Sequence, residues 1–291
     1  MLTIMEVFVV AICLINAVSA VSSVISNALV FLAILTTPSL HTPSNILLCN
    51  LALSDFGVSL IFQPLLIVNV ITISGSLLEY KEQIENLLRA SGLLFCALSA
   101  STMVAISLDR FLALYLHIRY YTLVTVKRTR IFLLILWLSY SIGLPTWAFS
   151  KRNFTSAVVL PFTSLYFITS LFCYIKIFQI VRRHRRQIAV QFKSVNVPFP
   201  KQGKSITTTL YIHVLFIICL IPILISNGVS VVIGKTQIAQ YLLYVSWTIL
   251  GLNSSLNPYL YCYRMRDIKK VVINMAKLFL CWRFLKSKRE R

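Results

Sequence analysis

The sequence predicts an all-α membrane protein, a bundle of seven transmembrane helices followed by a short amphipathic cytoplasmic helix. Three observations support this prediction. Hydrophobic residues make up 58% of the 291 residues and charged residues only 12%, which is too apolar for an ordinary soluble domain. Long apolar runs recur along the chain, and most Lys and Arg residues lie in alternate gaps between these runs.

Seven apolar runs are each long enough to cross about 30 Å of hydrocarbon as a helix of about 20 residues. In lipid the backbone amides must bond within their own segment, and the runs far exceed the roughly 10 residues of a barrel strand, so helices are expected. We expect one helical domain over residues 1–291, with the first run retained as a helix. The predicted spans are 7–35, 46–73, 87–116, 131–149, 157–180, 206–233 and 238–263.

The basic residues predict how the helices are oriented. Only five of the 28 Lys and Arg residues lie in one set of gaps, and the rest lie on the opposite side or in the tail. Positively charged flanks stay in the cytoplasm, so the N-terminus is predicted outside and the C-terminus inside. Asn153, in the sequon Asn153-Phe154-Thr155, is then a candidate for glycosylation in an outside loop. No compact basic face is evident, and no nucleic-acid partner is expected.

Ionisable residues at membrane depth are costly, so Asp55, Asp109 and Arg110 each need a reason to be there. They fall within short motifs that occur in successive spans. The motif residues are Asn27 in SNALV, Asp55 in LALSD, Asp109-Arg110-Phe111, Trp137, Tyr174, Phe216 to Pro222, and Asn257-Pro258-Tyr259-Leu260-Tyr261. Taken together, these motifs resemble those of rhodopsin-like (class A) G-protein-coupled receptors, nearest in look to the melanocortin, lysophospholipid, cannabinoid and adenosine branch.

The resemblance implies a receptor, not an enzyme, at the plasma membrane. Such a receptor transmits the binding of an extracellular or membrane-derived ligand to a heterotrimeric G protein by outward movement of its sixth helix. Two alternatives remain: an atypical receptor-like partner that does not signal, because Leu220 and Tyr166 replace the family's sixth-helix Trp and fifth-helix Pro, and a transporter. Against a transporter, the chain shows no repeated halves with paired intramembrane charges.

Asp55 is the centre of the first predicted site. The resemblance implies an allosteric sodium ion there, and no other cofactor is expected. One carboxylate and several neutral oxygens suit a hard cation. The alternative is a hydrogen-bonded polar cluster with Asp55 protonated. The predicted site consists of Asp55, Ser99, Asn253, Ser254 and Asn257.

The second predicted site is a switch for G-protein coupling. The resemblance implies that Arg110 pairs with Asp109 at rest and receives a G-protein segment on activation. No acidic residue lies between Arg186 and Thr207, so the chain supplies no carboxylate for the cross-helix ionic lock of some relatives, and ligand-independent activity is expected. The predicted switch residues are Asp109, Arg110, Tyr174, Pro222, Pro258 and Tyr261.

The ligand stays open between a small molecule, a lipid and a peptide. Gly92 stands where amine receptors of the family carry an Asp, and Gly251 where opsins carry a Lys, so both classes are disfavoured. Glu85 occupies the position of the Cys that usually pins the outer loop. A mostly apolar outer cavity suits a lipid or a weakly polar ligand. Its candidate residues are Gly92, Leu93, Cys96, Val158, Ile223, Leu224, Asn227, Leu243 and Trp247.

The segment after the last span alternates basic and apolar residues at helical spacing. It predicts an amphipathic helix over residues 265–282 that lies along the inner leaflet, with membrane lipids as partners. Cys281 in this segment is a candidate for palmitoylation.

Overall fold

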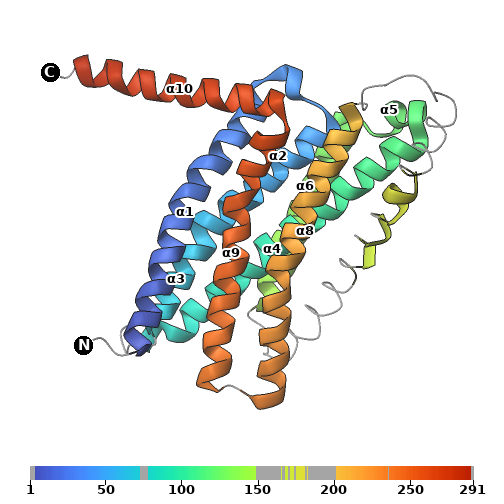
Figure 1. The fold of residues 1–291 in the computed structure, drawn as a ribbon. Helices are drawn as coiled ribbons and strands as arrows, with labels where there is room; N and C mark the ends of the chain where they lie inside the picture. Colours follow the sequence, from blue (N-terminus) through green and yellow to red (C-terminus); the bar gives the residue numbers. More distant parts are fainter. Residues whose placement is uncertain are drawn as a thin grey trace.

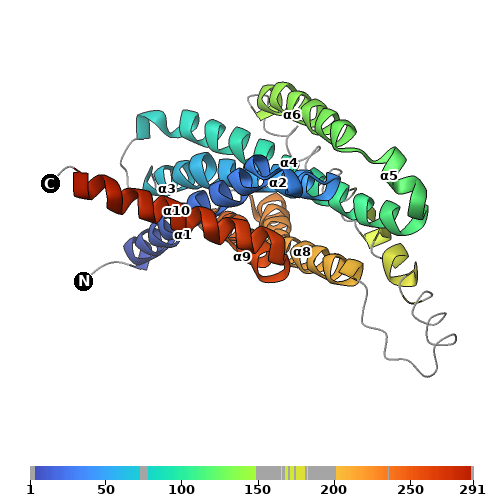
Figure 2. The ribbon, with the colours of Figure 1, turned by 90° about the horizontal axis from the view of Figure 1, so that it is seen from above.

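The computed structural model describes residues 4–72, 78–148, 201–234 and 236–289, together with 165, 168–169, 171–173, 175–180 and 182. Over these residues every regular element is a helix, and the long helices lie side by side in one bundle (Figure 1). The last helix crosses the end of the bundle that lies opposite the N-terminus (Figures 1 and 2). The long helices are α1 (Ile4–Thr36), α2 (Pro43–Gly57), α3 (Gln63–Ile71), α4 (Lys81–Leu116), α6 (Val126–Ala148), α8 (Lys201–Ile233), α9 (Gln237–Arg264) and α10 (Arg266–Arg289).

Short helical segments join some of these elements. They are the 3-10 turns η1 (Pro38–Leu40), η4 (Leu78–Tyr80) and η5 (His117–Arg119), the π-helical η2 (Val58–Phe62) and the single turn α5 (Tyr120–Leu123). Within the predicted fifth span, residues 171–173 and 175–180 are helical, and most of residues 157–170 lie outside the described part of the chain.

Four helical stretches among the described residues are long and apolar enough to cross a membrane. They are Met5–Thr36, Pro43–Ile71, Lys81–Leu123 and Leu210–Ile233. Large apolar side chains such as Val18, Val21 and Ile225 point out of the bundle and are more than half exposed. In a bilayer these side chains contact acyl chains instead of water, so their exposure costs nothing there.

Several helices begin at residues that satisfy free backbone amides. Thr42 precedes α2, and its side chain accepts a hydrogen bond from the Asn45 amide, while Pro43 occupies the first turn, where no amide hydrogen is needed. Thr236 caps α9 in the same way through the Ala239 amide. Between α8 and α9, Gly234 has φ +71, a conformation that glycine adopts without a side-chain clash. The chain therefore reverses tightly between these two helices.

The helices extend beyond the apolar spans that the sequence predicts. α4 begins at Lys81, six residues before the predicted span, and α10 continues to Arg289, seven residues past the predicted end. The added residues are too polar for hydrocarbon but include Lys, Arg and Glu, which are good helix formers. Apolar run length therefore locates the membrane-buried part of a helix, and helix propensity sets its true end.

The second predicted span is not a uniform α-helix. Five π-helical residues, Val58–Phe62, separate α2 from α3, and Pro64 lies in the first turn of α3. Proline has no amide hydrogen and its ring crowds the preceding turn, so a helix must adjust its hydrogen bonding before it. The wider π turn accommodates Pro64 and leaves Phe62 and Gln63 buried inside the bundle.

Two apolar clusters form the core. One lies towards the α10 end and includes Val30, Leu47, Met103, Ile212 and Tyr261. The other lies towards the N-terminal end and includes Ile12, Leu66, Leu88, Phe95 and Tyr244. The buried polar residues described below connect helices within and between these clusters.

Candidate functional site

Asp55 of α2 is completely buried and is bonded from α9 on both of its carboxylate oxygens. The Ser254 hydroxyl donates to Oδ1 at 3.0 Å, and the Asn257 amide donates to Oδ2 at 2.7 Å. Ser254 and Asn257 lie three residues apart, so they share one face of α9. A carboxylate that would be costly alone in an apolar interior is therefore held by two donors from one helix.

The other two residues predicted for this site lie beside Asp55. Ser99 of α4 shares a 2.9 Å hydrogen bond with Ser54, the residue next to Asp55. Asn253 is buried, and its Oδ1 accepts no hydrogen bond from any described residue; the same is true of Asn257 Oδ1. Two amide oxygens beside a carboxylate therefore remain able to accept a donor or to bind a cation.

A small cavity adjoins Asp55. Its open volume is about 10 Å³, which suits one water molecule or a small ion and excludes an organic ligand. Carboxylate, hydroxyl and amide oxygens are the donors that a hard cation such as sodium prefers, so the chemistry of the lining fits a sodium ion. The cavity is lined by Asp55, Val58, Phe62, Cys96, Ser99, Phe216, Leu250, Gly251, Asn253 and Ser254.

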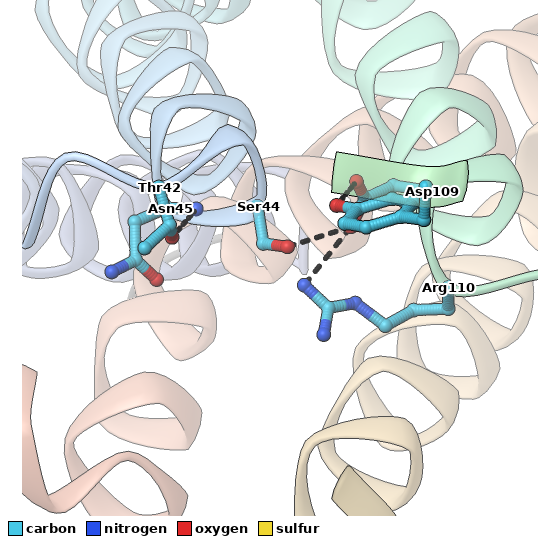
Figure 3. A network of polar contacts seen from close by, with 6 residues as sticks. Thr42, Ser44, Asn45, Asp109 and Arg110 are labelled. Carbon is cyan, nitrogen blue, oxygen red and sulfur yellow. Dashed lines mark hydrogen bonds and ion pairs between the residues drawn. The ribbon is translucent and has the colours of Figure 1, made fainter. Parts of the chain in front are cut away.

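The Asp109–Arg110 pair lies near the far end of α4 (Figure 3). Arg110 Nη2 is 3.0 Å from Asp109 Oδ2, and the same oxygen accepts a 2.7 Å hydrogen bond from Ser44 of α2. The Tyr120 hydroxyl donates to the other oxygen, Oδ1, at 2.6 Å. Asp109 is therefore fixed by three helical segments and orients the guanidinium of Arg110.

The end of α4 brings Tyr120 back to Asp109. His117 ends the helix with φ 49 and ψ −113, a positive-φ conformation that is uncommon for residues other than glycine. η5 and α5 follow directly, and Tyr120 begins α5 with its ring buried. The sequence motifs do not indicate Ser44 or Tyr120 as partners of Asp109, because neither residue belongs to the motif that contains this carboxylate.

The other predicted switch residues lie on α8 and α9. Pro222 lies inside α8, and its carbonyl oxygen accepts a 3.0 Å hydrogen bond from the Ser246 hydroxyl of α9. Pro258 lies inside α9. Tyr261 is completely buried, and its hydroxyl bonds to no described residue. Tyr174 lies outside the described residues.

Two further motif residues connect neighbouring helices. The Trp137 indole of α6 donates to Asn50 Oδ1 at 2.8 Å, and Asn50 Nδ2 donates to Thr102 of α4 at 2.7 Å. Asn27 of α1 donates to the Ser254 carbonyl at 3.0 Å. These contacts hold α1, α2, α4, α6 and α9 together around the Asp55 cavity.

A line of buried polar contacts on α1 was not expected from the sequence. Asn16 donates to Thr248 of α9 at 2.9 Å. Gln63 of α3 donates to Ser19 at 2.8 Å, and the Ser59 hydroxyl donates to Ser23 at 2.5 Å. The recurrence of Asn and Ser on α1 every three or four residues is the only sequence signal of this contact line.

The predicted outer cavity is partly filled by the π-helical segment. A Cβ on Gly92 would lie 2.9 Å from the Phe62 ring, and a Cβ on Gly251 would lie 2.9 Å from Gln63 Nε2. Phe62 also packs edge-on against Trp247, with 6.4 Å between ring centroids. The two positions that carry ligand anchors in amine receptors and opsins therefore accommodate Phe62 and Gln63 in this chain.

The remaining predicted residues are not gathered into one pocket in the described part of the chain. Cys96 lines the Asp55 cavity. Asn227 is exposed, and its amide donates to the Ile223 carbonyl of its own helix. Leu93, Ile223, Leu224, Leu243 and Trp247 are half-buried. Val158 and Asn153 lie outside the described residues, and Cys281 lies in α10.

An apolar helical bundle with an internal carboxylate and an Asp–Arg pair at one end of a long helix is typical of seven-helix receptors. Residues 26–261 match the model of the seven-transmembrane receptor family (rhodopsin family). The chain therefore belongs to this family. It is a multi-pass membrane protein with a seven-helix bundle, and a G-protein-coupled receptor instead of an enzyme or a transporter.

Individual relatives agree with this assignment. The chain is 30% identical over 265 residues to G-protein coupled receptor 12 of Homo sapiens, covering 84% of this chain and 75% of that protein. It is 25% identical over 280 residues to adenosine receptor A3 of Ovis aries, covering 88% and 86%. It is 27% identical over 308 residues to adenosine receptor A2b of Gallus gallus, covering 90% and 87%. These likenesses agree with the adenosine and lipid-receptor branch expected from the motifs.

Proposed function

We propose that this receptor transmits ligand binding to a heterotrimeric G protein by moving α8 away from α4 at the end of the bundle where Arg110 lies. The observation that carries this proposal is the Asp109–Arg110 pair. Asp109 accepts bonds from Ser44 and Tyr120 as well as pairing with Arg110, so Arg110 is oriented by a network that includes a segment beyond α4.

Release of Arg110 from this network would free a guanidinium for a G-protein segment. Arg presents several donors in a fixed planar arrangement, which suits backbone carbonyls or a carboxylate on a docking peptide. Pro222 lies inside α8, in its second half, and removes one backbone hydrogen bond there. α8 can therefore bend at this proline and open its Arg110 end while its other end stays packed on α9. Pro258, Tyr261 and Tyr174 are proposed to complete the moving contacts.

We propose an extracellular N-terminus and a cytoplasmic C-terminus in the plasma membrane. The asymmetry in Lys and Arg supports this orientation. α10 leaves the bundle beside the end of α1, at the end of the bundle where α5 lies (Figure 1). Its basic residues include Arg266, Lys269, Lys270 and Lys277, which would face the anionic headgroups of the inner leaflet. Asn153 as a glycosylation site and Cys281 as a palmitoylation site belong to the same proposal.

The Asp55 cluster is proposed as an allosteric sodium site. Asp55, Ser99, Asn253, Ser254 and Asn257 would surround the ion. The support comes from two amide oxygens without donors from the described residues, from a fully buried carboxylate and from a cavity the size of an ion. A bound cation would compensate the buried negative charge and join α2 to α9. The alternative is a protonated Asp55 without an ion, in which case sodium would not change the melting temperature of the intact chain.

A lipid or a weakly polar small molecule is the proposed ligand. Support comes from the absence of a carboxylate or an amine at positions 92 and 251 and from the aromatic residues Phe62, Tyr244 and Trp247 that pack against one another. Apolar walls with few polar groups are typical of such binding sites. A peptide ligand would need contacts from the outer loops.

The test is signalling in cells that express the chain with a panel of chimeric G-protein reporters. Basal or ligand-evoked signal is expected from the intact chain, and Arg110→Ala should abolish it. Arg128→Ala is the matched control, since Arg128 of α6 is exposed and its guanidinium donates to backbone carbonyls of α5, so this variant should retain the signal. All variants are compared at equal surface expression. Silence of the intact chain with every reporter and with lipid extracts would support the non-signalling alternative.

A further inference from the structure

α4 and α8 are joined by a buried polar contact within an apolar interface. Ser107 Oγ of α4 lies 3.1 Å from His213 Nε2 of α8, and both residues are completely buried. Neighbouring residues of the same two helices belong to one buried apolar cluster, namely Met103, Ile106, Ile212 and Phe216. His213 appears in the sequence as a lone histidine within a span, and the fold provides it with a partner 106 residues away.

The direction of this hydrogen bond follows from the other contact of Ser107. The Ser107 hydroxyl donates to the Met103 carbonyl of its own helix at 3.0 Å. Its single hydrogen is then used, so the oxygen accepts from His213, and Nε2 carries the hydrogen. The contact is therefore between an imidazole N–H donor and a serine oxygen, and a bond of this kind does not depend on a charge on either partner.

The position of the contact relates it to Arg110. Ser107 lies three residues before Arg110 in α4, about one helical turn from it. α8 contains no Asp or Glu over residues 201–234, so it offers no carboxylate to the Arg110 end of α4. The Ser107–His213 bond is thus a polar link between the two helices that involves no carboxylate, at the level where they would separate.

We propose that the Ser107–His213 hydrogen bond is a latch that holds α8 against α4 in the resting receptor and sets its basal activity. This inference rests on the proposed movement of α8. Separation of the helices breaks the bond between the imidazole N–H and Ser107, and the loss of a buried hydrogen bond is costly. His213 acts as a positioning residue, because its bond biases the position of α8 and makes no contact with the G protein.

Four variants test the latch by their basal signal at equal surface expression. His213→Leu fills similar space without a donor, and Ser107→Ala removes the acceptor, so each should raise basal signalling by about fivefold or more. The double variant should add little to either one, since both remove the same bond. His213→Gln should keep the basal signal near that of the intact chain, because the Gln side-chain amide can donate from a position close to that of Nε2.

Tyr140→Phe is the matched control. Tyr140 of α6 shares a 2.6 Å hydrogen bond with Ser101 of α4, so this variant removes another interhelical bond of α4 without touching α8. It should leave the basal signal unchanged. An unchanged basal signal in both His213→Leu and Ser107→Ala, with the intact chain signalling, would overturn the latch. A rise in Tyr140→Phe equal to that in His213→Leu would also overturn it, because the effect would then be general loosening.

A distance measurement separates failure of the latch from failure of the proposed function. Nitroxide labels at the Arg110 end of α4 and at the start of α8 report their separation by electron spin resonance in purified, full-length protein. His213→Leu should shift the distance distribution to longer values relative to the intact chain. A shift without any G-protein signal would contradict the proposed coupling and support the latch. A signal that depends on Arg110, without a shift in the distance, would support the proposed coupling and contradict the latch.

Discussion

Asn257 of α9 donates a 2.7 Å hydrogen bond to Asp55 of α2 across a separation of 202 residues. Ser254 supports the other carboxylate oxygen from the same helix face. Because both donors lie on α9, the carboxylate joins α2 to α9, and any group that binds it also affects the packing of these helices. Binding of the proposed ion at the Asp55 cluster should therefore change the thermal stability of the protein, even when no ligand is bound.

Replacement of KCl by NaCl at constant ionic strength should raise the melting temperature of the purified protein in detergent. An ion that binds only the folded state stabilises it by about 2.7 kcal/mol when its concentration is a hundred times Kd. Asp55→Asn should abolish this sodium response, because it removes the negative charge. Thr248→Val, which removes a buried bond of α9 to Asn16, should retain the response. A full sodium response in Asp55→Asn would refute the site, and no response in the intact chain would favour a protonated Asp55.

Tyr120→Phe should lower the melting temperature by several degrees. The variant removes a 2.6 Å hydrogen bond to the Asp109 carboxylate, and bonds to charged groups contribute about 1.5–3 kcal/mol. The neighbouring Tyr121 offers a matched control, because its side chain is 73% exposed, so Tyr121→Phe should change the melting temperature little. Equal melting temperatures for the two variants would show that the Asp109 network contributes nothing to stability.

Gly251→Ala should destabilise the bundle by about 1–3 kcal/mol, the usual range for overpacking. The new methyl group would lie 2.9 Å from Gln63 Nε2, and Gln63 is held in place by Ser19. Gln63→Ala in the same chain should recover part of the loss by removing the crowded amide. Thermal melting in detergent measures both effects.

Gly228→Ala is the control for this substitution. A Cβ at Gly228 meets nothing within 4 Å, so only the better helix propensity of Ala acts there, and the melting temperature should stay equal or rise. Equal destabilisation by the two alanines would mean that crowding against Gln63 is not the cause.

The class of the protein and most of its helices follow from the amino-acid sequence. Apolar run length predicts the spans because backbone amides in lipid must bond within their own segment, so each span is a local structure. The ends of α4 and α10 and the π turn before Pro64 differ from the predicted spans. These differences arise where helix propensity or proline sterics act more strongly than hydrophobicity.

The sequence motifs identified only some of the residues in the two sites. Motif positions grouped Asp55 with Ser254 and Asn257, and the structure places both within hydrogen-bond distance of it. Ser99 bonds to Ser54 and lines the same cavity as Asp55. No motif indicated the bonds of Ser44 and Tyr120 to Asp109, the Gln63 contact with Gly251 or the Ser107–His213 pair.

The reason for this division is the range of the interactions. Hydrophobicity, helix propensity and the distribution of Lys and Arg act within one segment or at its ends, so they can be read along the chain. A hydrogen bond between Ser107 and His213, or between Ser44 and Asp109, depends on which faces of two helices meet. That choice is made by the packing of the whole bundle, and only the three-dimensional structure records it.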